Sequence, residues 1–468
     1  MAKIKPRTFK GTHDFTPQEM IPRERLIQRI KELFRKYGFS PMETPALEML
    51  EVLSGKYGEE SDKLIYKLDY KNDRPHDRVA LRYDLTVPLA RVVASHPEWL
   101  MPFKRYQIQP VWRADQPQLR QGRFREFYQC DVDTIGAEEG LADAEIIALT
   151  VDLVNILGFT GESRQAVVLV NHRRLLESLC EFAGRPVSDL MVFCRALDKL
   201  DKIGIDGVRE ELALIGVTSD GFARMNKVFA LEGTALEKLD ALKRILPQNQ
   251  ATHEGIQALQ NIFTILDALK TPSERLRLEP RLARGLDYYT GTVFETIVPQ
   301  QPHLGSLAGG GRYDKLIGLY CGRDLPATGT TIGLDRIFAA MEQLNMIDMS
   351  TFTVTTVLLS AYSDEEIPAA LKILTAMRDH DLAAELFPTT GKMKKPFTYA
   401  DKMKIPYVAV VGPDEVADAN NPKVALKDLR QGTQEVIEIA EAIRRIKAGM
   451  TNNTFSGITG CLDHIQKF

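Results

Sequence analysis

The sequence predicts a mixed α+β chain of several domains, and three observations carry this prediction. Its 468 residues are enough for about two to four domains at roughly 100–200 residues each. Two strand-like segments, Arg105–Trp112 and Arg125–Val132, flank a polar segment and predict a hairpin with a long loop. Helical periodicity prevails from about Arg173 to Leu276, and strands alternate with helices after about Met349.

The elements before the helical stretch follow from apolar spacing. Apolar residues in Leu26–Tyr37 recur at the spacing of one helix face, so this segment is predicted to be a helix. Pro41 and Pro45 then favour an extended segment. Beyond the hairpin, the pattern from Gly140 to Leu157 is helical again.

The elements after the helical stretch begin with a strand at Val293–Val298 and include a helix after Gly333. In the C-terminal part, Ser363 and Glu366 have the spacing of a capping box, which predicts a helix start. Further strands and helices are expected there in alternation: strands at Val354–Leu359, Ala383–Phe387 and Tyr407–Val411, and helices near Lys395–Met403 and Gln434–Lys447.

Composition and charge exclude several classes of protein. Hydrophobic residues make up 44% of the chain and charged residues 26%, which excludes a wholly disordered chain. The net charge of −3 does not predict a nucleic-acid partner, so any basic surface must be local. The N-terminus lacks the apolar segment of a secretory signal, and we expect no membrane span.

The five cysteines and eight histidines are scattered along the chain. They form neither a disulfide framework nor a pattern of metal ligands. The sequence therefore predicts a cytoplasmic protein without a metal site built from a cluster of its own side chains.

The predicted hairpin is strongly basic, with six Lys or Arg and one acid between Lys104 and Arg125. Charge alone favours a solvated face over a binding site by roughly two to one. The residue pattern is more specific. Segments 112–115 and 122–127 resemble motif 2 of the class II aminoacyl-tRNA synthetases, in which an arginine ends one strand and an aromatic residue on the returning strand stacks on adenine.

Two further segments resemble the other motifs of that class. Segment 329–336 is similar to motif 3, a glycine-rich strand that leads into a helix whose arginine reaches the γ-phosphate of ATP. The helix around Ile30, followed by Pro45, resembles motif 1, a dimerisation element. Segments 81–86, 126–133, 284–291 and 308–314 are similar to the histidyl-tRNA synthetase family in particular, and the resemblance extends from about Gly11 to Lys447.

The resemblance implies a fold and a division into domains. The fold is an antiparallel class II synthetase core of six strands with flanking helices, interrupted by a helical insertion and followed by a C-terminal α/β anticodon-binding domain. The implied boundaries are 1–175 and 277–348 for the two parts of the core, 176–276 for the insertion, 349–447 for the anticodon-binding domain and 448–468 for a tail.

The resemblance also implies an activity, the ATP-dependent ligation of L-histidine to tRNA(His) through a histidyl-adenylate. Mg²⁺ is expected on the β- and γ-phosphates of ATP, and a cytoplasmic homodimer with no membrane partner is expected. The residues that match the family's histidine site are Asp84, Thr86 and Gln129 for the α-ammonium, and Asp133 with either Tyr288 or Tyr289 for the imidazole. The two tyrosines could also be core aromatics.

The ATP site implied by the resemblance centres on two arginines. Arg113 and Arg284 would hold the α-phosphate, where charge develops during adenylate formation. Phe127 would stack on adenine and Asp115 would contact its amino group, although Asp115 stands where motif 2 usually has glutamate. The remaining candidates are Arg123 and Arg336 for the outer phosphates, and Arg120, Lys392, Lys394 and Lys395 for tRNA.

Alternatives from other classes of protein remain. The lysine cluster near residue 394 could be a solvated helix face, which charge runs usually are by roughly two to one. A regulatory subunit of histidine biosynthesis without catalytic activity could share this fold, as could an RNA-binding or signalling module that retains it. Histidine-dependent exchange of pyrophosphate into ATP distinguishes the ligase from both.

Overall fold

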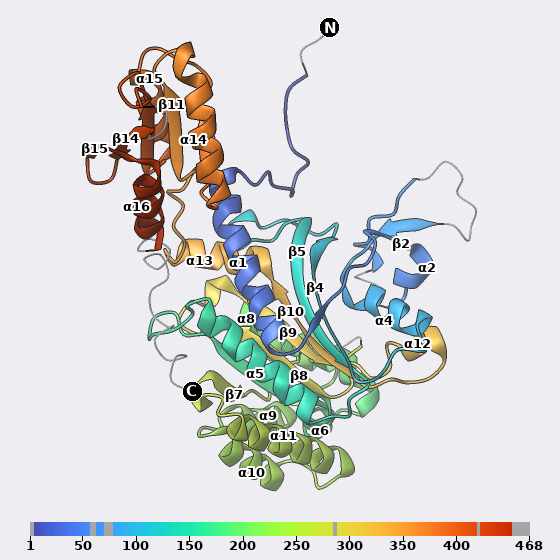
Figure 1. Cartoon of the computed structure of the whole chain (residues 1–468). Helices are drawn as coiled ribbons and strands as arrows, with labels where there is room; N and C mark the ends of the chain where they lie inside the picture. Colours follow the sequence, from blue (N-terminus) through green and yellow to red (C-terminus); the bar gives the residue numbers. More distant parts are fainter. Residues whose placement is uncertain (1–3, 57–61, 70–77, 284–287, 419–421, 452–468) are drawn as a thin grey trace. The chain divides into compact units, whose positions relative to one another are not determined.

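A computed structural model describes residues 4–56, 62–69, 78–283, 288–418 and 422–451 (Figure 1). The chain divides into two compact units, each described by itself below. The larger unit comprises Met1–His13 and Arg29–Leu344, and the smaller unit comprises Asp14–Gln28 and Asn345–Phe468. Helix α1 (Pro17–Lys36) begins earlier than its apolar pattern predicts and contributes residues to both units.

The larger unit is built on a sheet that has eight strands within the described residues. Six of them run antiparallel to their neighbours in the order β4-β5-β10-β9-β8-β6, and the short edge strands β1 and β7 pair in parallel with β4 and β6. The mixed α+β prediction with an antiparallel core is confirmed. The strands are β1 (Ser40–Pro41), β4 (Phe103–Trp112), β5 (Glu126–Ile135), β6 (Val167–His172), β7 (Leu276–Leu278), β8 (Thr292–Ile297), β9 (Ala308–Arg312) and β10 (Ala327–Gly333).

The predicted hairpin is the β4–β5 pair. Its register runs from Phe103 opposite Ile135 to Trp112 opposite Glu126, so the strands are paired along their full length. The connecting loop contains the 3₁₀ turn η1 (Leu119–Gln121). Gly122 follows with φ 64°, and a Cβ there would overlap the carbonyl oxygen of Asp335, so glycine is required where the loop meets the next element.

Helices cover the sheet and form the insertion (Figure 1). Helix α5 (Leu141–Ile156) is buried along most of its length, which explains its apolar composition. The helical stretch predicted from about Arg173 to Leu276 contains α6 to α11, drawn mostly in green in Figure 1. These helices are α6 (Arg173–Phe182), α7 (Leu190–Leu197), α8 (Leu200–Leu214), α9 (Ser219–Phe229), α10 (Ala235–Ile245) and α11 (Gln250–Ala268).

Shorter elements complete the larger unit. A two-stranded sheet of β2 (Leu47–Met49) and β3 (Val79–Leu81) precedes α4 (Thr86–Ser95). Helix α13 (Leu334–Gln343) follows β10 directly, as the glycine-rich segment predicted. The remaining pieces are α2 (Leu50–Leu53), α12 (Gly318–Cys321), η2 (Val187–Asp189), η3 (Ser273–Arg275) and η4 (Pro302–Leu304).

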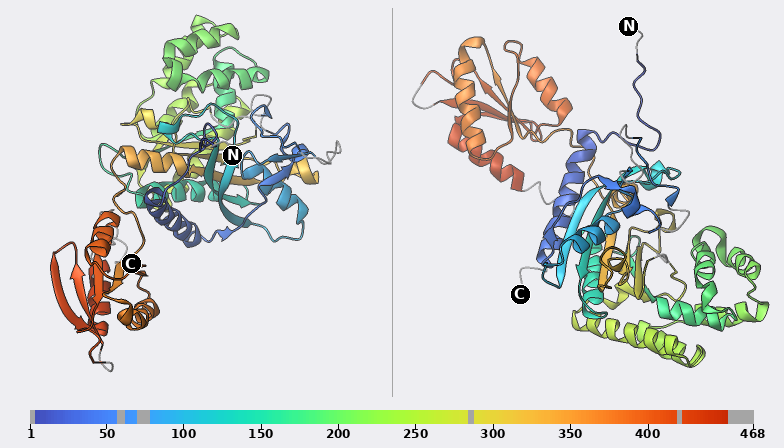
Figure 2. Two further views of the ribbon diagram at one scale, coloured as in Figure 1. Left: turned by 90° about the horizontal axis from the view of Figure 1, so that it is seen from above. Right: turned by 90° about the vertical axis from the view of Figure 1, so that its right-hand side faces the viewer.

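The smaller unit has a five-stranded mixed sheet in the order β12-β11-β13-β14-β15. Helices α14 and α16 pack on one face through Ile373 and Ile443, and α15 packs on the other through Ala400, which gives three layers (Figure 2). The elements are β11 (Val357–Ala361), η5 (Asp364–Glu366), α14 (Ile367–Asp379), β12 (Ala384–Leu386), α15 (Lys394–Met403), β13 (Tyr407–Val411), β14 (Lys423–Asp428), β15 (Thr433–Glu438) and α16 (Ile439–Thr451).

Two local predictions for this unit had different outcomes. The capping box is confirmed, because the Ser363 amide and hydroxyl both donate to the Glu366 carboxylate, at 2.8 and 2.7 Å. The helix predicted over Gln434–Lys447 is wrong at its start. Residues Thr433–Glu438 are the edge strand β15, paired with β14, and the helix begins only at Ile439.

Four of the five cysteines lie within the described residues. Within the described residues, Cys130, Cys180, Cys194 and Cys321 are free thiols, and no group of three or more His, Cys, Asp or Glu could hold a metal ion. Among those same residues, no helix is both long and apolar enough to cross a membrane.

Candidate active site

One face of strand β5 forms the floor of the candidate site. Phe127, Gln129, Asp131 and Asp133 alternate with the other face, so their side chains lie on the same side of the sheet. Gln129, Asp131 and Asp133 are 5%, 1% and 3% exposed. Buried polar groups in such a row require partners, and the neighbouring strands supply only some of them.

Arg113 stands at the end of β4, beside the start of this row. Its guanidinium lies 5.2 Å from the centre of the Phe127 ring and 4.3 Å from that of Tyr83. Its Nε donates to the Tyr83 carbonyl oxygen at 3.1 Å, and the described residues offer the terminal nitrogens no further hydrogen bond. An arginine held in this way by its stem presents its terminal N–H groups to a ligand.

Asp133 is held from two sides at the far end of the row. The buried Arg105 guanidinium, on the opposed position of β4, lies 2.8 Å from Asp133 Oδ2. The buried Tyr313 hydroxyl donates to Asp133 Oδ1. Burial raises the pKa of Asp133, while Arg105 and Tyr313 lower it and offset part of that effect. These two partners fix the orientation of the carboxylate.

The adjacent tyrosines 288 and 289 complete this end of the site. Their rings are 4.7 Å apart in an edge-on arrangement, and the Tyr288 ring lies 6.1 Å from that of Tyr313. Burial, Tyr289 and Asp84 raise the pKa of Tyr288, so its phenol stays protonated and can donate a hydrogen bond. Both tyrosines also pack against the hydrophobic cluster that includes Val87 and Leu316, so they contribute to the core as well as lying near Tyr313.

Asp84 and Thr86 lie where helix α4 begins. Asp84 Oδ1 accepts a hydrogen bond from the Val87 amide at 3.1 Å, and Thr86 is the first helical residue. Both are buried, at 5% and 6% exposure. A capping contact of this kind fixes the position of the carboxylate at the helix start.

Glycines allow the neighbouring strands to approach this row closely. A Cβ at Gly329, opposite Asp133 on β10, would overlap the Asp133 carboxylate. A Cβ at Gly310 would overlap the carbonyl oxygen of Gly329, and one at Gly311 would lie 3.1 Å from the Tyr289 ring. The glycine-rich stretches in β9 and β10 are thus required by close packing at the site.

The loop between β4 and β5 carries the other ATP candidates. Asp115 and Arg120 are exposed, and Arg123 is half-buried. Arg336, in the first turn of α13, donates to the Ser306 carbonyl oxygen at 2.8 Å.

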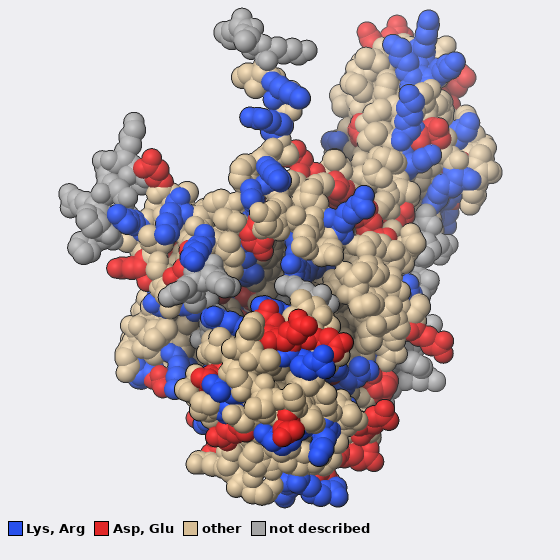
Figure 3. Space-filling view, turned by 180° about the vertical axis from the view of Figure 1, so that it is seen from behind, with Lys and Arg blue, Asp and Glu red and all other residues tan. Residues whose placement is uncertain are grey.

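Arg284 lies outside the described residues. In the smaller unit, three candidates for tRNA contact are exposed at the start of α15: Lys392, Lys394 and Lys395. Basic side chains gather on the part of this unit at the top right of Figure 3.

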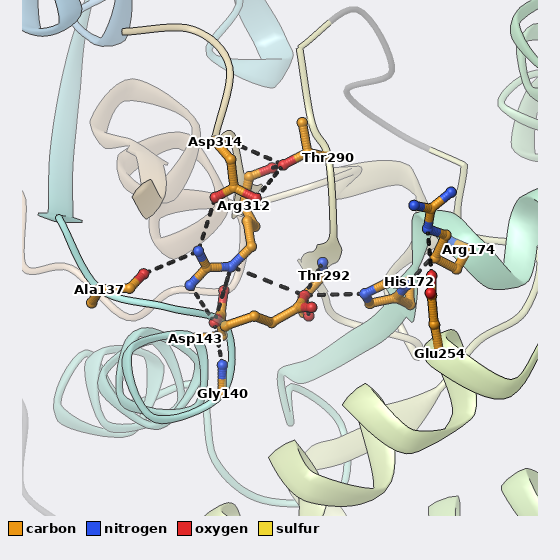
Figure 4. Close-up of polar contacts among 11 residues, drawn as sticks. Ala137, Gly140, Asp143, His172, Arg174, Glu254, Thr290, Thr292, Arg312 and Asp314 are labelled. Carbon is orange, nitrogen blue, oxygen red and sulfur yellow. Dashed lines mark hydrogen bonds and ion pairs between the residues drawn. The ribbon is translucent and has the colours of Figure 1, made fainter. Parts of the chain in front are cut away.

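A buried ionic network that the sequence did not reveal supports the segment bearing the tyrosines (Figure 4). The Arg312 guanidinium is 2% exposed and pairs with the fully buried Asp143, with 2.7 Å between Nη2 and Oδ2. Its Nη1 lies 2.9 Å from Asp314 Oδ1. Asp314 Oδ2 accepts a hydrogen bond from the Thr290 hydroxyl at 2.9 Å, directly after the two tyrosines.

Glu139 links this network to the start of the insertion. Its Oε1 accepts hydrogen bonds from the Thr292 amide and hydroxyl, at 3.0 and 2.9 Å, and from His172 Nε2 at 3.0 Å. His172 Nδ1 accepts from the Arg174 amide at 3.1 Å, which caps α6 and assigns the ring proton to Nε2. Sequence spacing could not have found the contacts of Arg312 with Asp143 and of Thr292 with Glu139, because these residues lie far apart in the chain.

The arrangement suits the activation of a small amino acid by a nucleotide. An arginine beside an aromatic ring can hold a phosphate next to a stacked base. Buried carboxylates and phenols a few residues along the same strand can bind a polar, cationic ligand.

Comparisons with known proteins agree with this arrangement. Residues 11–337 match the family model of histidyl-tRNA synthetase, and residues 354–449 match that of an anticodon binding domain. A histidine–tRNA ligase from Gloeobacter violaceus is 42% identical, over 93% of this chain and 97% of that protein. One from Aeropyrum pernix is 38% identical, over 96% of this chain and 99% of that protein.

Solved structures give the same result. The crystal structure of histidyl-tRNA synthetase from Nostoc sp. PCC 7120 is 31% identical, with a TM-score of 0.83 over 96% of this chain and the whole of that one. A structure from Bacillus halodurans described as an ATP phosphoribosyltransferase regulatory subunit/histidyl-tRNA synthetase has a TM-score of 0.70 over 88% of this chain and 99% of that one. It is only 23% identical and so shows the fold alone.

The antiparallel sheet, the arginine and aromatic pair on its hairpin and the glycine-rich strand before α13 define a class II aminoacyl-tRNA synthetase. More particularly, the chain belongs to the histidyl-tRNA synthetase family. It is therefore an enzyme of translation, a ligase that charges tRNA with histidine, and the resemblance drawn from the sequence is confirmed.

Proposed function

We propose that the chain charges tRNA(His) in two steps at the β5 row, with the residues named from the sequence in the roles that follow. Histidine and ATP form histidyl-adenylate and pyrophosphate, and the histidyl group then passes to the 3′ end of the tRNA. No side chain becomes covalently modified, so positioning and charge stabilisation supply the catalysis.

The ATP end of the site lies beside Arg113. As the histidine carboxylate attacks the α-phosphorus, negative charge grows on the phosphate oxygens, and the terminal N–H groups of Arg113 stabilise it. Adenine stacks on Phe127, whose ring already lies beside that guanidinium. Arg284 binds the same phosphate from a second side, Asp115 contacts the adenine amino group, and Arg123 and Arg336 bind the outer phosphates.

The histidine end of the site lies beside Asp133. Its carboxylate, held in place by Arg105 and Tyr313, accepts one imidazole N–H. A phenol from Tyr288 or Tyr289 pairs with the other ring nitrogen. Asp84, Thr86 and Gln129 hold the α-ammonium. An amino acid whose side chain lacks two hydrogen-bonding nitrogens would leave these buried protein groups unpaired, so the site would reject it as a substrate.

Mg²⁺ is proposed to arrive with ATP. Since no group of acidic or histidine side chains within the described residues could hold a metal alone, the ligands that fit it are the β- and γ-phosphate oxygens. When bound, it would neutralise part of the phosphate charge.

The tRNA contacts are proposed on both units. Arg120, which is exposed on the loop between β4 and β5, is proposed to contact a phosphate of the acceptor end. The exposed lysines at the start of α15 supply the backbone contacts expected of an anticodon-binding unit. We also propose that the enzyme acts as a cytoplasmic homodimer through the segment around α1, β1 and Pro45.

The observation that supports this function most is that the Arg113–Phe127 pair lies at one end of the row of buried acidic and amide side chains on β5. Exchange of labelled pyrophosphate into ATP tests it, with each of the common amino acids supplied in turn. Exchange with histidine alone, followed by charging of tRNA(His), is the expected result. Binding of histidine without exchange would favour the catalytically inactive regulatory subunit instead.

A further inference from the structure

Two buried acceptors on neighbouring positions of the β5 face lack donors. Asp131 and Gln129 are two residues apart, so their side chains lie on the same face of the strand. Within the described residues, neither oxygen of Asp131 nor Gln129 Oε1 makes a hydrogen bond of normal length and angle. Buried acceptors without donors are costly, so this pair points to a ligand that brings N–H groups.

The contrast with Asp133 makes the observation specific. Asp133 lies two residues further along the same face. Tyr313 donates a hydrogen bond to its Oδ1, and its Oδ2, which has no hydrogen bond of normal geometry, lies 2.8 Å from the Arg105 guanidinium. Asp131 is 1% exposed and has no such ion pair within the described residues, although a side-chain interaction with Thr331 lowers its pKa.

Charged and polar groups from several parts of the larger unit act on Asp131. Burial raises the pKa of Asp131 to about 8; Arg105 on β4 and a side-chain hydrogen bond with Thr331 on β10 lower it, while Asp133 and Asp84 raise it. The charge of Asp131 in turn contributes to the raised pKa of Tyr288. Asp131 and Asp133 both interact with the Arg105 guanidinium, and Asp84 adds a third negative charge nearby, so an added cation is favoured here.

A second guanidinium is close but already engaged. The charge of Asp131 raises the pKa of Arg82 slightly, against the larger lowering by burial. The N–H groups of Arg82, however, donate to the carbonyl oxygens of Thr44, Pro45 and Pro110 and to the Gln109 side-chain oxygen. It cannot turn toward Asp131 without leaving buried carbonyl groups unpaired.

A primary ammonium fits this position better than an imidazole. It brings a full positive charge and three N–H donors, whereas the neutral imidazole of histidine has one N–H. We propose that Asp131 is an unassigned member of the histidine site, and that its carboxylate and the Gln129 side-chain oxygen together accept the α-ammonium of histidine. This inference rests on the proposed function and adds a second anion to Asp84.

If the proposal is correct, binding of histidine should release protons to the buffer. Because burial raises the pKa of Asp131, part of this carboxyl group is protonated at pH 7 before a ligand binds. An arriving ammonium stabilises the ionised carboxylate, so the carboxyl O–H bond breaks and its proton passes to the buffer. The ammonium keeps its own protons.

Calorimetric titration of the full-length protein with histidine at pH 7 measures this, using buffers of different ionisation enthalpy. Histidine and histidinol, which both carry the ammonium, should each release protons. The analogue 3-(imidazol-4-yl)propanoate, which lacks it, should release clearly fewer. Equal proton release by all three ligands from the wild-type protein would overturn the proposal without any variant.

The variant Asp131→Asn, which keeps the size and removes the charge, should bind histidine roughly tenfold to a hundredfold more weakly and lose the proton release. Its affinity for the analogue should change little. Exposed Asp240, on α10, provides the matched control Asp240→Asn, which should behave as wild type. Unchanged affinity and proton release in Asp131→Asn would exclude the role.

The outcomes also separate this proposal from the proposed function. Wild-type protein that exchanges pyrophosphate with histidine but shows no ammonium-dependent proton release refutes the role of Asp131 alone. Wild-type protein that neither binds histidine nor supports exchange refutes both.

Discussion

Replacing Glu139 by glutamine should destabilise the larger unit at neutral pH and change how its stability depends on pH. Burial raises the pKa of Glu139, but hydrogen bonds from His172 and Thr292 outweigh it and lower the pKa from 4.5 to about 2. A lowering of this size corresponds to about 3 kcal/mol. Because the side chain is 30% exposed, solvent screening reduces the expected effect to about 2 kcal/mol.

The sign of the pH dependence follows from the lowered pKa. The folded protein favours the ionised carboxylate, so the stabilisation is fully present above about pH 4.5 and is lost as the pH falls toward 2. The difference between wild type and Glu139→Gln should be constant from pH 8 to about 5 and about a quarter smaller at pH 4.

A second variant separates charge from hydrogen bonding. Glutamine keeps an acceptor oxygen for Thr292 and His172, whereas Glu139→Ala removes it and leaves those buried donors unpaired. The alanine variant should therefore lose about 1–3 kcal/mol more.

Urea unfolding followed by tryptophan fluorescence measures these changes. Trp99 and Trp112 are the chain's two tryptophans, and both belong to the larger unit, so the signal reports on that unit. A glutamine variant as stable as wild type at pH 7, or a difference that stays the same at pH 4, would refute this account of Glu139.

Three further predictions concern the ATP site, the strand packing and tRNA. Arg113→Ala should lower pyrophosphate exchange on the order of 10²-fold with an unchanged circular dichroism spectrum, and exchange at the wild-type rate would exclude its role. Gly329→Ala should lower the unfolding midpoint and raise the KM for histidine because its Cβ overlaps Asp133. Gly333→Ala is the control, since its nearest neighbouring atom lies at 3.5 Å and it should be tolerated. The triple replacement of Lys392, Lys394 and Lys395 by alanine should weaken tRNA binding and flatten its salt dependence, while pyrophosphate exchange stays unchanged. An unaltered salt dependence of tRNA binding would exclude these lysines from the tRNA interface.

Local signals predicted much of the fold. The β4–β5 hairpin was placed almost to the residue, because alternating strand residues and a polar loop are properties of neighbouring positions. The capping box at Ser363 was found for the same reason. The order of the motifs along the chain then indicated the family, because motif order is inherited within a family and can be read from the sequence without knowing the packing.

Element boundaries without a local signal were missed. Strand β15 is exposed along most of its length and has no alternating pattern. Its identity depends on pairing with β14, which no spacing within the segment reveals. The first half of α1 likewise lacks the apolar repeat that marked its second half.

The sequence alone determined which residues are present at the candidate site and which strand carries most of them. Only the tertiary structure decided what each one touches. Arg105 on β4 and Tyr313, directly after β9, hold Asp133, and these segments are brought together by pairing between distant parts of the chain. The same pairing leaves Asp131, two residues away on the same face, without an ion pair of this kind among the described residues. Hydrogen bonding and burial are properties of neighbours in space, so two aspartates that look alike in the sequence acquire different chemistry.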